Sequence, residues 1–214
     1  MKIAVIDYRS GNLHSVLKSF QNAASEFENV SVKITSYYKD VQGADKVVLP
    51  GVGSFAFCKS KLLENTDVYK ALVDLVIEKK TPFLGICVGM QLLATKGDEG
   101  QDNNEGLGWI CGEVKKIEVD KRFKIPHMGW NSLSFKNSHP LFKNINTNEH
   151  FYFVHSYEFI ACAENDVVAT TSHGKNIVAA IAKENMIGLQ FHPEKSQNPG
   201  LKIIRNFIKW DPFR

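Results

Sequence analysis

The first half of the chain alternates short apolar runs with segments whose apolar residues recur at helical spacing. Runs of strand length occupy residues 2–6, 32–35, 46–49 and 83–86. One predicted helix lies between the first two runs, and a second begins at Asn65, a favourable N-cap residue. Their apolar faces comprise Leu13, Val16, Leu17, Phe20, Ala24 and Phe27, and Val68, Leu72, Leu75 and Val76. This alternation predicts a parallel sheet with right-handed crossovers.

From about Gly106 the pattern changes to short apolar segments without intervening helices. These segments cover residues 113–119, 151–154, 167–171, 177–181 and 186–191, and a closing helix opens at Pro199-Gly200. No repeat, linker or low-complexity tract interrupts the chain. We therefore predict one α/β domain over residues 1–214, an open and mostly parallel sheet flanked by helices with an antiparallel β extension.

Composition narrows the class of protein. The chain has 214 residues, 43% of them apolar and 23% charged, with a net charge of +3, which is typical of a soluble globular domain. The basic clusters are short, so no nucleic-acid partner is expected. The apolar start of the chain is too short for a signal peptide, and residues 71–77 are too short to span a bilayer, so no membrane association is expected.

The four cysteines show neither a C-x-x-C pair nor zinc-ligand spacing. We therefore expect free thiols in a reducing cytoplasm. The histidines outside the motifs discussed below also lack ligand spacing, and the chain contains no phosphate-binding or dinucleotide-binding glycine motif. No metal and no cofactor are predicted.

In open α/β sheets, ligands bind beyond the carboxyl ends of the strands. Three segments of this chain follow predicted strands directly: residues 7–12, residues 50–55 and the turn around Cys87. Their expected convergence predicts a site at this edge of the sheet.

The turn around Cys87 has the pattern of a nucleophile elbow. An apolar strand leads into Gly85-Ile86-Cys87-Val88-Gly89 and then into a predicted helix. This is the Gly-x-nucleophile-x-Gly pattern with sulfur in place of a hydroxyl, and small neighbours are needed where the turn is sharp. A helix N-terminus would favour the thiolate. The alternative is a buried structural cysteine between two incidental glycines.

A second candidate segment lies far downstream, where a predicted strand runs into Gln190-Phe191-His192-Pro193-Glu194. The residue before a proline is held extended, so the side chains of His192 and Glu194 should point the same way. A carboxylate beside a histidine fixes its tautomer and supports its positive charge. With Cys87, the pair would form a nucleophile–base–orienter set.

Together these segments resemble the class I (triad-type) glutamine amidotransferases over essentially the whole chain. Three further blocks are typical of the family's glutaminase subunits in histidine biosynthesis: residues 49–55 (LPGVGSF), 126–131 (PHMGWN) and 152–157 (YFVHSY). The resemblance implies a glutaminase in which Cys87 attacks glutamine, His192 transfers protons and Glu194 orients His192.

The resemblance also assigns the binding residues. It places an oxyanion hole at Val52, Gly53 and Val88, and glutamine contacts at Gly51, Gln91, Ser156 and Tyr157. Gln91 stands four residues after Cys87, one helical turn further on. His155 and His127 are alternative bases, but neither has a carboxylate two residues later. A structural or interfacial role is favoured for both.

No acceptor site for ammonia is evident in the sequence, so the resemblance implies a partner chain. That partner is a cyclase subunit with a (β/α)₈ barrel, which would form a heterodimer with this chain and receive the ammonia released from L-glutamine. The candidate contact residues are Asn12, His127, Trp130, Asn131 and Lys195. Trp130 suits an interface anchor, although a place in the core is the ordinary role of tryptophan.

Other interpretations remain open at this point. A related glutaminase could serve pyridoxal phosphate synthesis, which normally has a Gly-Gly-Glu-Ser loop where this chain has residues 51–54 (GVGS), or surface-sugar amidation, which shares nearly all of the motifs. A catalytically inactive scaffold and a stand-alone cysteine peptidase are alternatives from other classes. One position departs from the family pattern. Arg9 stands where a glycine is usual, so either this position does not need a positive φ or the loop is reshaped.

Overall fold

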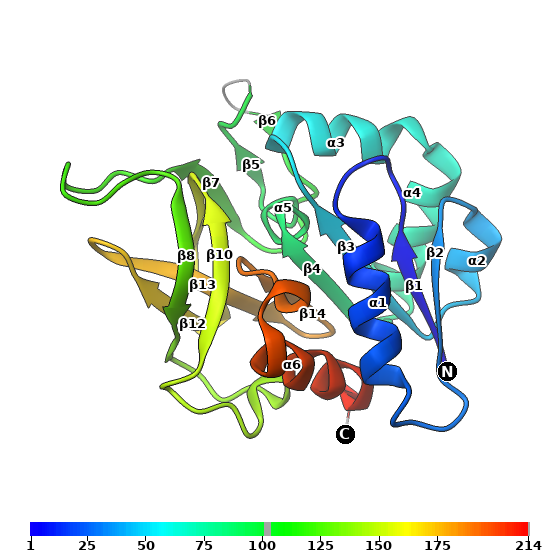
Figure 1. The fold of residues 1–214 in the computed structure, drawn as a ribbon. Helices are drawn as coiled ribbons and strands as arrows, with labels where there is room; N and C mark the ends of the chain where they lie inside the picture. The colour runs from blue at the N-terminus through cyan, green and yellow to red at the C-terminus, as the bar shows by residue number, and fades with distance from the viewer. Residues whose placement is uncertain (101–103, 214) are drawn as a thin grey trace.

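The apolar runs of the first half form neighbouring parallel strands. The computed structural model describes residues 1–100 and 104–213. Its main sheet has eight strands in the order β2-β1-β3-β4-β14-β13-β12-β9 (Figure 1). The strands from β2 to β14 in this order are parallel. They are β1 (Lys2–Ile6), β2 (Ser31–Thr35), β3 (Lys46–Gly51), β4 (Phe83–Cys87) and β14 (Met186–Leu189).

Helices cover both faces of these strands. On one face, α1 (Leu13–Ala24) packs against α6 (Gln197–Lys209), with the rings of Phe20 and Phe207 in edge contact (Figure 1). The connections from β2 to β4 supply α2 (Tyr38–Gln42), α3 (Phe55–Glu64), α4 (Thr66–Val73) and a π-helical turn η1 (Asp74–Glu78). The side chain of Asn65 caps α4 as predicted, and the side chain of Ser54 caps α3.

The β-rich second half extends the sheet and adds two small sheets. The extension is antiparallel and consists of β13 (Asn176–Lys183), β12 (Val167–Ser172) and β9 (Ser134–Phe135). One small sheet pairs β8 (His127–Ser132) with β10 (His150–His155). The other contains β11 (Tyr157–Ala161), β7 (Gly112–Lys116), β5 (Lys96–Gly97) and β6 (Asn104–Glu105). Short 3-10 turns occupy η2 (Pro140–Phe142), η3 (Glu164–Asp166) and η4 (Pro193–Lys195). The predicted α/β fold with an antiparallel extension is confirmed.

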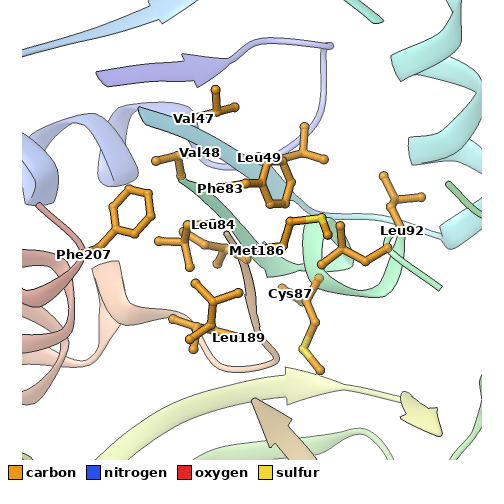
Figure 2. Packing of buried hydrophobic residues seen from close by; sticks show 14 of the residues in the cluster. Val47, Val48, Leu49, Phe83, Leu84, Cys87, Leu92, Met186, Leu189 and Phe207 are labelled. Atoms are coloured by element: carbon orange, nitrogen blue, oxygen red, sulfur yellow. The ribbon is translucent and has the colours of Figure 1, made fainter. Parts of the chain in front are cut away.

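The core lies around the central parallel strands. All six residues of β3 and all five of β4 are buried, which explains why these strands are continuous apolar runs rather than alternating patterns. Side chains of β3, β4, β14 and α6 meet between the layers, and Cys87 belongs to the same cluster (Figure 2). This packing fixes the end of β4, where the nucleophile elbow begins.

The expectation of four free thiols is wrong for two cysteines. Cys111 and Cys162 form a disulfide, whereas Cys58 and Cys87 are free and buried. The antiparallel register of β7 and β11 places Gly112 opposite Ala161, so the two adjacent cysteines come together with a Cα–Cα distance of 5.5 Å. The separation of 51 residues in the sequence concealed this pairing. Cysteine usage therefore no longer argues for the cytoplasm.

The helices in the described part of the chain are all too short or too polar to cross a bilayer.

Candidate active site

The elbow at Cys87 is sharp because two glycines allow the backbone to pass close by. Cys87 has a φ of +54°, in the left-handed region that non-glycine residues rarely occupy. A Cβ on Gly85 would lie 2.5 Å from the carbonyl oxygen of Gly89, and a Cβ on Gly89 would lie 1.8 Å from that of Leu49. Both glycines are therefore required by the packing of the turn against β3 and β4. The left-handed conformation of Cys87 is the kind of strain that clusters at functional sites.

The helix that follows differs from the sequence expectation. The α-helix α5 contains only Val88–Gln91, a single turn. A macrodipole of this length contributes little, so the electrostatic support for a Cys87 thiolate must come chiefly from side chains.

The histidine predicted as the base lies beside the cysteine. His192 Nδ1 is 2.8 Å from Glu194 Oε1, and both side chains are almost completely buried. Because the carboxylate accepts at Nδ1, the other ring nitrogen of His192 is free to serve Cys87. Burial opposes a charge on His192, but hydrogen bonding and attraction to the Cys87 thiolate and to Glu194 outweigh it and raise the pKa of His192 to about 10. The structure thus favours the imidazolium form of His192.

Cys87 and His192 line a cavity of about 280 Å³, and Glu194 contacts His192 from outside this lining. The cavity is of a size for an amino acid rather than for a polypeptide or nucleotide. Its lining residues are Val52, Gly53, Cys87, Val88, Gln91, Glu99, Pro126, Val154, His155, Ser156, Tyr157, His192 and Lys195. A larger cavity of about 550 Å³ lies near Asp7 and Asp67, but no nucleophile–base pair lines it. The chemistry therefore assigns the smaller cavity as the candidate site.

Most of the predicted glutamine contacts line this cavity, but Gly51 does not. Gln91, Ser156 and Tyr157 do so, although Gln91 comes from α5, Ser156 from between β10 and β11, and Tyr157 from the start of β11. Gly51 is buried in β3 opposite Cys87. A Cβ there would lie 2.7 Å from both the backbone nitrogen of Gly89 and the hydroxyl of Tyr8. Close packing behind the elbow, rather than substrate contact, explains this glycine.

The proposed oxyanion loop is held by the first loop of the chain. The hydroxyl of Tyr8 donates to the carbonyl of Pro50 at 2.7 Å. The N–H of Val52 donates to Ser10 Oγ at 3.1 Å, so in this conformation it is not available to an oxyanion. Val52 therefore departs from the expectation, because the neighbouring hydroxyl occupies its donor. Gly53, with a φ of +120°, and Val88 line the cavity.

Comparisons with known proteins show the family of the chain. The family model described as "Glutamine amidotransferase class-I" matches residues 4–210. The chain belongs to this family. Among its curated relatives, "Imidazole glycerol phosphate synthase subunit HisH" of Brucella abortus (strain 2308) is 47% identical over 217 residues, covering 99% of this chain and 100% of the relative. The subunit of the same name from Ruegeria pomeroyi is 46% identical over 213 residues, with the same coverage.

Solved structures share the fold of this amidotransferase at lower identity. A glutamine amidotransferase from Thermotoga maritima superposes with a TM-score of 0.65 at 18% identity, covering 100% of this chain and 87% of the other. The glutaminase domain of a Trypanosoma brucei CTPS, solved with bound acivicin, gives a TM-score of 0.66 at 17% identity, covering 97% and 92%. These likenesses concern the fold alone.

The first loop of the amidotransferase shows which backbone conformation Arg9 adopts at a position where glycine is usual. Arg9 has a φ of +64°, so this position does adopt the conformation for which glycine is suited. An Asp7 carboxylate oxygen accepts from the Arg9 N–H at 2.9 Å and helps to hold the turn. The loop is therefore not reshaped to avoid a positive φ; an arginine occupies it at some cost in strain.

Two residues of the site escaped the sequence analysis. Glu99 lies in the loop after β5, lines the cavity and accepts from the N–H of Phe55 at 3.1 Å. Burial raises the pKa of its carboxyl group, an effect that this hydrogen bond partly offsets. Gln190 is completely buried and lies next to Cys87. Gln190 could have been suspected from its place two residues before His192, but nothing in the sequence around Glu99 pointed to it.

The two alternative histidine bases are uncharged and engaged elsewhere. Burial, the largest effect, lowers the pKa of His155 to about 3 and that of His127 to about 4. His155 Nδ1 contacts the carbonyl oxygen of Tyr157 at 2.8 Å, and its Nε2 contacts His127 Nδ1 at 3.0 Å. Neither histidine is paired with a carboxylate in these contacts. Their contacts support the structural interpretation.

The candidate partner residues fall into two groups. Asn12, Trp130 and Lys195 are exposed, and the Trp130 side chain stands against the ring of Tyr152. Asn131 is half-buried and contacts His127 Nε2 at 3.1 Å. His127 itself is only 3% exposed. Placing His127 on the partner surface was therefore wrong for its side chain, because β8 turns it inward beneath Asn131. Among the described residues, no group of three His, Cys, Asp or Glu side chains is arranged to hold a metal ion.

Proposed function

We propose that this chain is the glutaminase subunit of imidazole glycerol phosphate synthase, with Cys87, His192 and Glu194 as its catalytic residues. The observation that carries the catalytic assignment is the buried His192–Glu194 pair beside Cys87 in a cavity of amino-acid size. The full-length similarity to HisH subunits supports the enzyme and its pathway. The substrate is L-glutamine, and the products are glutamate and ammonia.

The arrangement suits a two-step acyl transfer. The Cys87 thiolate attacks the carbon of the side-chain amide, and the carbonyl oxygen becomes an oxyanion. The imidazolium of His192 then gives its proton to the amide nitrogen, which leaves as ammonia, and a γ-glutamyl thioester remains. Neutral His192 next removes a proton from water, which attacks the thioester and releases glutamate. Glu194 keeps the imidazole in one tautomer and supports its charge.

Backbone donors hold the oxyanion in this proposal. The N–H of Val88 follows the nucleophile directly, and a second donor comes from the loop of Val52 and Gly53. The Val52 peptide must leave Ser10 before it can serve. Losing one such donor typically costs ~10²–10³ in rate, so a site with the loop held would turn over slowly.

The charged end of glutamine needs partners of opposite charge. We assign the α-ammonium group to Glu99, whose carboxylate belongs to the residues that line the cavity. Gln91 Oε1 is a buried acceptor without a hydrogen-bond partner among the described residues, and it would receive a donor from the substrate. Ser156, Tyr157 and the exposed amine of Lys195 lie where the α-carboxylate would be held.

The released ammonia has to reach an acceptor before water protonates it. We propose that the acceptor site is on a cyclase subunit with a (β/α)₈ barrel, bound as a heterodimer over the exposed Met128 and Trp130 of β8. Lys195 lies between this face and the cavity, with its amine 5.7 Å from the ring of Tyr152. A biosynthetic enzyme of this kind would work in the cytoplasm.

A direct experiment tests the catalytic assignment. The purified chain with its cyclase subunit is assayed for glutamate release, and Cys87→Ser and His192→Asn variants are expected to lose several orders of magnitude in turnover. A diazo-oxo-norleucine, which mimics glutamine, should label Cys87 and spare Cys58. Labelling at Cys58 alone, or full turnover by Cys87→Ser, would reject the triad.

A second experiment separates the histidine pathway from surface-sugar amidation. The gene is expressed in a bacterial strain that lacks its own glutaminase subunit of imidazole glycerol phosphate synthase, on medium without histidine and with low ammonium. Growth with the parent gene, and none with Cys87→Ser, is expected. Binding to an amidating synthase of surface sugars, with no growth on this medium, would favour the alternative.

A further inference from the structure

A buried amide stands directly behind the nucleophile and touches two residues of the site. Gln190 follows the last residue of β14, and its backbone N–H donates to the carbonyl of Ala179 at 2.9 Å. Its side-chain Nε2 lies 3.7 Å from the sulfur of Cys87. Its Oε1 lies 3.0 Å from Nε2 of Gln91. The parallel register of β14 with β4 explains this position, because Leu189 is paired with Ile86, one residue before Cys87.

The direction of these hydrogen bonds is fixed by a backbone carbonyl. The carbonyl oxygen of Tyr157 can only accept, and it lies 3.2 Å from Gln91 Nε2. The nitrogen of the Gln91 amide must therefore face Tyr157 and, with its second hydrogen, Gln190. Gln190 must consequently turn its oxygen toward Gln91 and its nitrogen toward Cys87. An isolated amide could turn either its oxygen or its nitrogen toward the sulfur. The contact with Gln91 decides between these orientations, so the Gln190 N–H donates to the sulfur of Cys87.

The same carbonyl is held from its other side. His155 Nδ1 lies 2.8 Å from the Tyr157 oxygen, and because that oxygen only accepts, the histidine donates. His155 is neutral, so its Nε2 accepts from His127 Nδ1 at 3.0 Å. The Tyr157 carbonyl oxygen therefore accepts from both sides, and from Gln91 through Gln190 the amide N–H groups donate toward Cys87. This arrangement leaves Gln91 Oε1 as the unpaired acceptor beside the cavity.

We propose that Gln190 is a positioning residue of the glutaminase reaction, whose amide nitrogen stabilises the Cys87 thiolate and whose amide oxygen fixes Gln91 for substrate binding. The proposal deepens the proposed function and rests on Cys87 as its nucleophile. A donor to the charged form of a thiol favours that form. A fixed Gln91 presents Oε1 to glutamine without first having to be ordered.

Two variants separate the two halves of this proposal. Gln190→Met has a similar length but offers neither donor nor acceptor. Gln190→Glu keeps oxygen atoms that can accept from Gln91, but its carboxylate offers no N–H to the sulfur. Both variants should make the Cys87 thiolate less stable. Only Gln190→Met should leave the side chain of Gln91 without its hydrogen-bond acceptor.

The reactivity of the Cys87 thiolate is measured as the rate at which iodoacetamide alkylates it in the full chain. This reaction does not depend on the recognition of glutamine. The labelled Cys87 peptide is quantified by mass spectrometry between pH 6 and pH 9.5. We expect both variants to react about tenfold more slowly than the parent at pH 6, and within about threefold of it at pH 9.5, where hydroxide ionises the thiol without help. Three other titratable groups interact electrostatically with Cys87: His192, Tyr8 and Cys58. Glu194 in turn interacts with His192. Both variants retain all four groups.

Substrate binding is read from the kinetics of the complex with the cyclase subunit. Gln190→Met is expected to raise the KM for glutamine about tenfold, and Gln190→Glu by less than about threefold. A matched control is Asn185→Leu, which removes another fully buried amide, at the opposite end of β14, where it donates to the carbonyls of Val76 and Thr81. This control should lower the unfolding temperature and leave the alkylation profile unchanged.

Two outcomes would overturn the inference. One is alkylation of both Gln190 variants at the parent rate throughout the pH range. The other is a uniform slowing at every pH that Asn185→Leu reproduces, since this would reflect general loosening. The proposed function fails separately: Cys87 of the parent chain would then react no faster than the buried Cys58.

Discussion

The hydroxyl of Ser10 forms hydrogen bonds with both the backbone N–H and the backbone carbonyl of Val52. Ser10 Oγ accepts from the Val52 N–H at 3.1 Å and donates to the Val52 carbonyl at 2.6 Å. The sulfur of Cys58 also lies 3.2 Å from this hydroxyl. One buried hydroxyl on the first loop thus keeps the Val52 N–H engaged, so that in this conformation it is not available to the oxyanion hole proposed above.

The first prediction is that Ser10→Ala raises the glutaminase activity of the chain in the absence of its partner. If the competent loop is populated at about 1% in the isolated subunit, full activation is about 100-fold, which corresponds to ~2.7 kcal/mol. Ser10→Ala removes two hydrogen bonds that favour the inactive conformation. It should therefore raise the activity of the isolated chain roughly tenfold, which is part of the full activation. Glutamate release is measured with and without the cyclase subunit, and the rate in the complex should change little.

A matched control lies on the same loop. Arg9→Gly relieves a left-handed arginine and removes no contact to Val52, so it should leave basal turnover unchanged. If Ser10→Ala is no more active alone than the parent chain, the hydroxyl does not restrain the loop. If it loses activity in the complex as well, Ser10 supports the active conformation instead.

The second prediction concerns Glu99. Glu99→Gln should raise the KM for glutamine by about 10- to 100-fold with a smaller effect on kcat, because a hydrogen bond between charged groups is replaced by one to a neutral amide. The control substrate is glutaramate, which carries the same amide but no α-ammonium group. The parent and the variant should hydrolyse it equally well. An equal loss on both substrates would place Glu99 in the chemical step or in the fold.

The third prediction concerns the elbow. Gly89→Ala would force a Cβ to within 1.8 Å of the Leu49 carbonyl oxygen, so backbone of β3 must move. We expect a loss of more than about 3 kcal/mol in the free energy of unfolding, measured with urea. Gly43→Ala is the control, because the added Cβ would lie 3.4 Å from the nearest atom at an ordinary φ of −92°. Similar stability of the two variants would show that the elbow can relax.

The sequence was most informative where a single segment carries its own geometry. Buried parallel strands appear as apolar runs, and the Cys87 elbow and the His192–Glu194 pair each lie within a few residues. The strand and helix positions before Cys87 followed from these patterns, apart from α2 and α3. The helix α3 was missed because Lys59, Ser60 and Lys61 separate two short apolar groups, which leaves only a weak apolar stripe.

Features that depend on two distant segments could not be predicted. The Cys111–Cys162 disulfide follows from the register of β7 and β11. The inward orientation of His127 follows from the pairing of β8 with β10. Glu99 reaches the cavity through its hydrogen bond to the first residue of α3. In each case the partner lies on another element, and only the folded chain reveals it.

The last prediction is a loss of stability in mild acid. Burial lowers the pKa of His139 to about 4, and the pKa values of His127 and His155 are lowered to a similar extent. The unfolded chain binds protons at these residues below pH 6.5, and the folded chain does not until near pH 4. The free energy of unfolding should therefore fall between pH 7 and pH 5, by about 1 to 2 kcal/mol for each histidine. His192 adds little here, because its raised pKa keeps its contribution fully present below pH 6.5.

His139 offers a matched test of this pH dependence. Its Nδ1 accepts from the N–H of Leu141 at 3.1 Å, and the side chain of Asn can accept in the same position without titrating. The free energy of unfolding is measured with urea at pH 7 and at pH 5 for the parent and for His139→Asn. Between these pH values it should fall by about 1 kcal/mol less in the variant than in the parent. Equal losses would mean that His139 takes up its proton in the folded chain as readily as in the unfolded one, and that the acid sensitivity arises elsewhere.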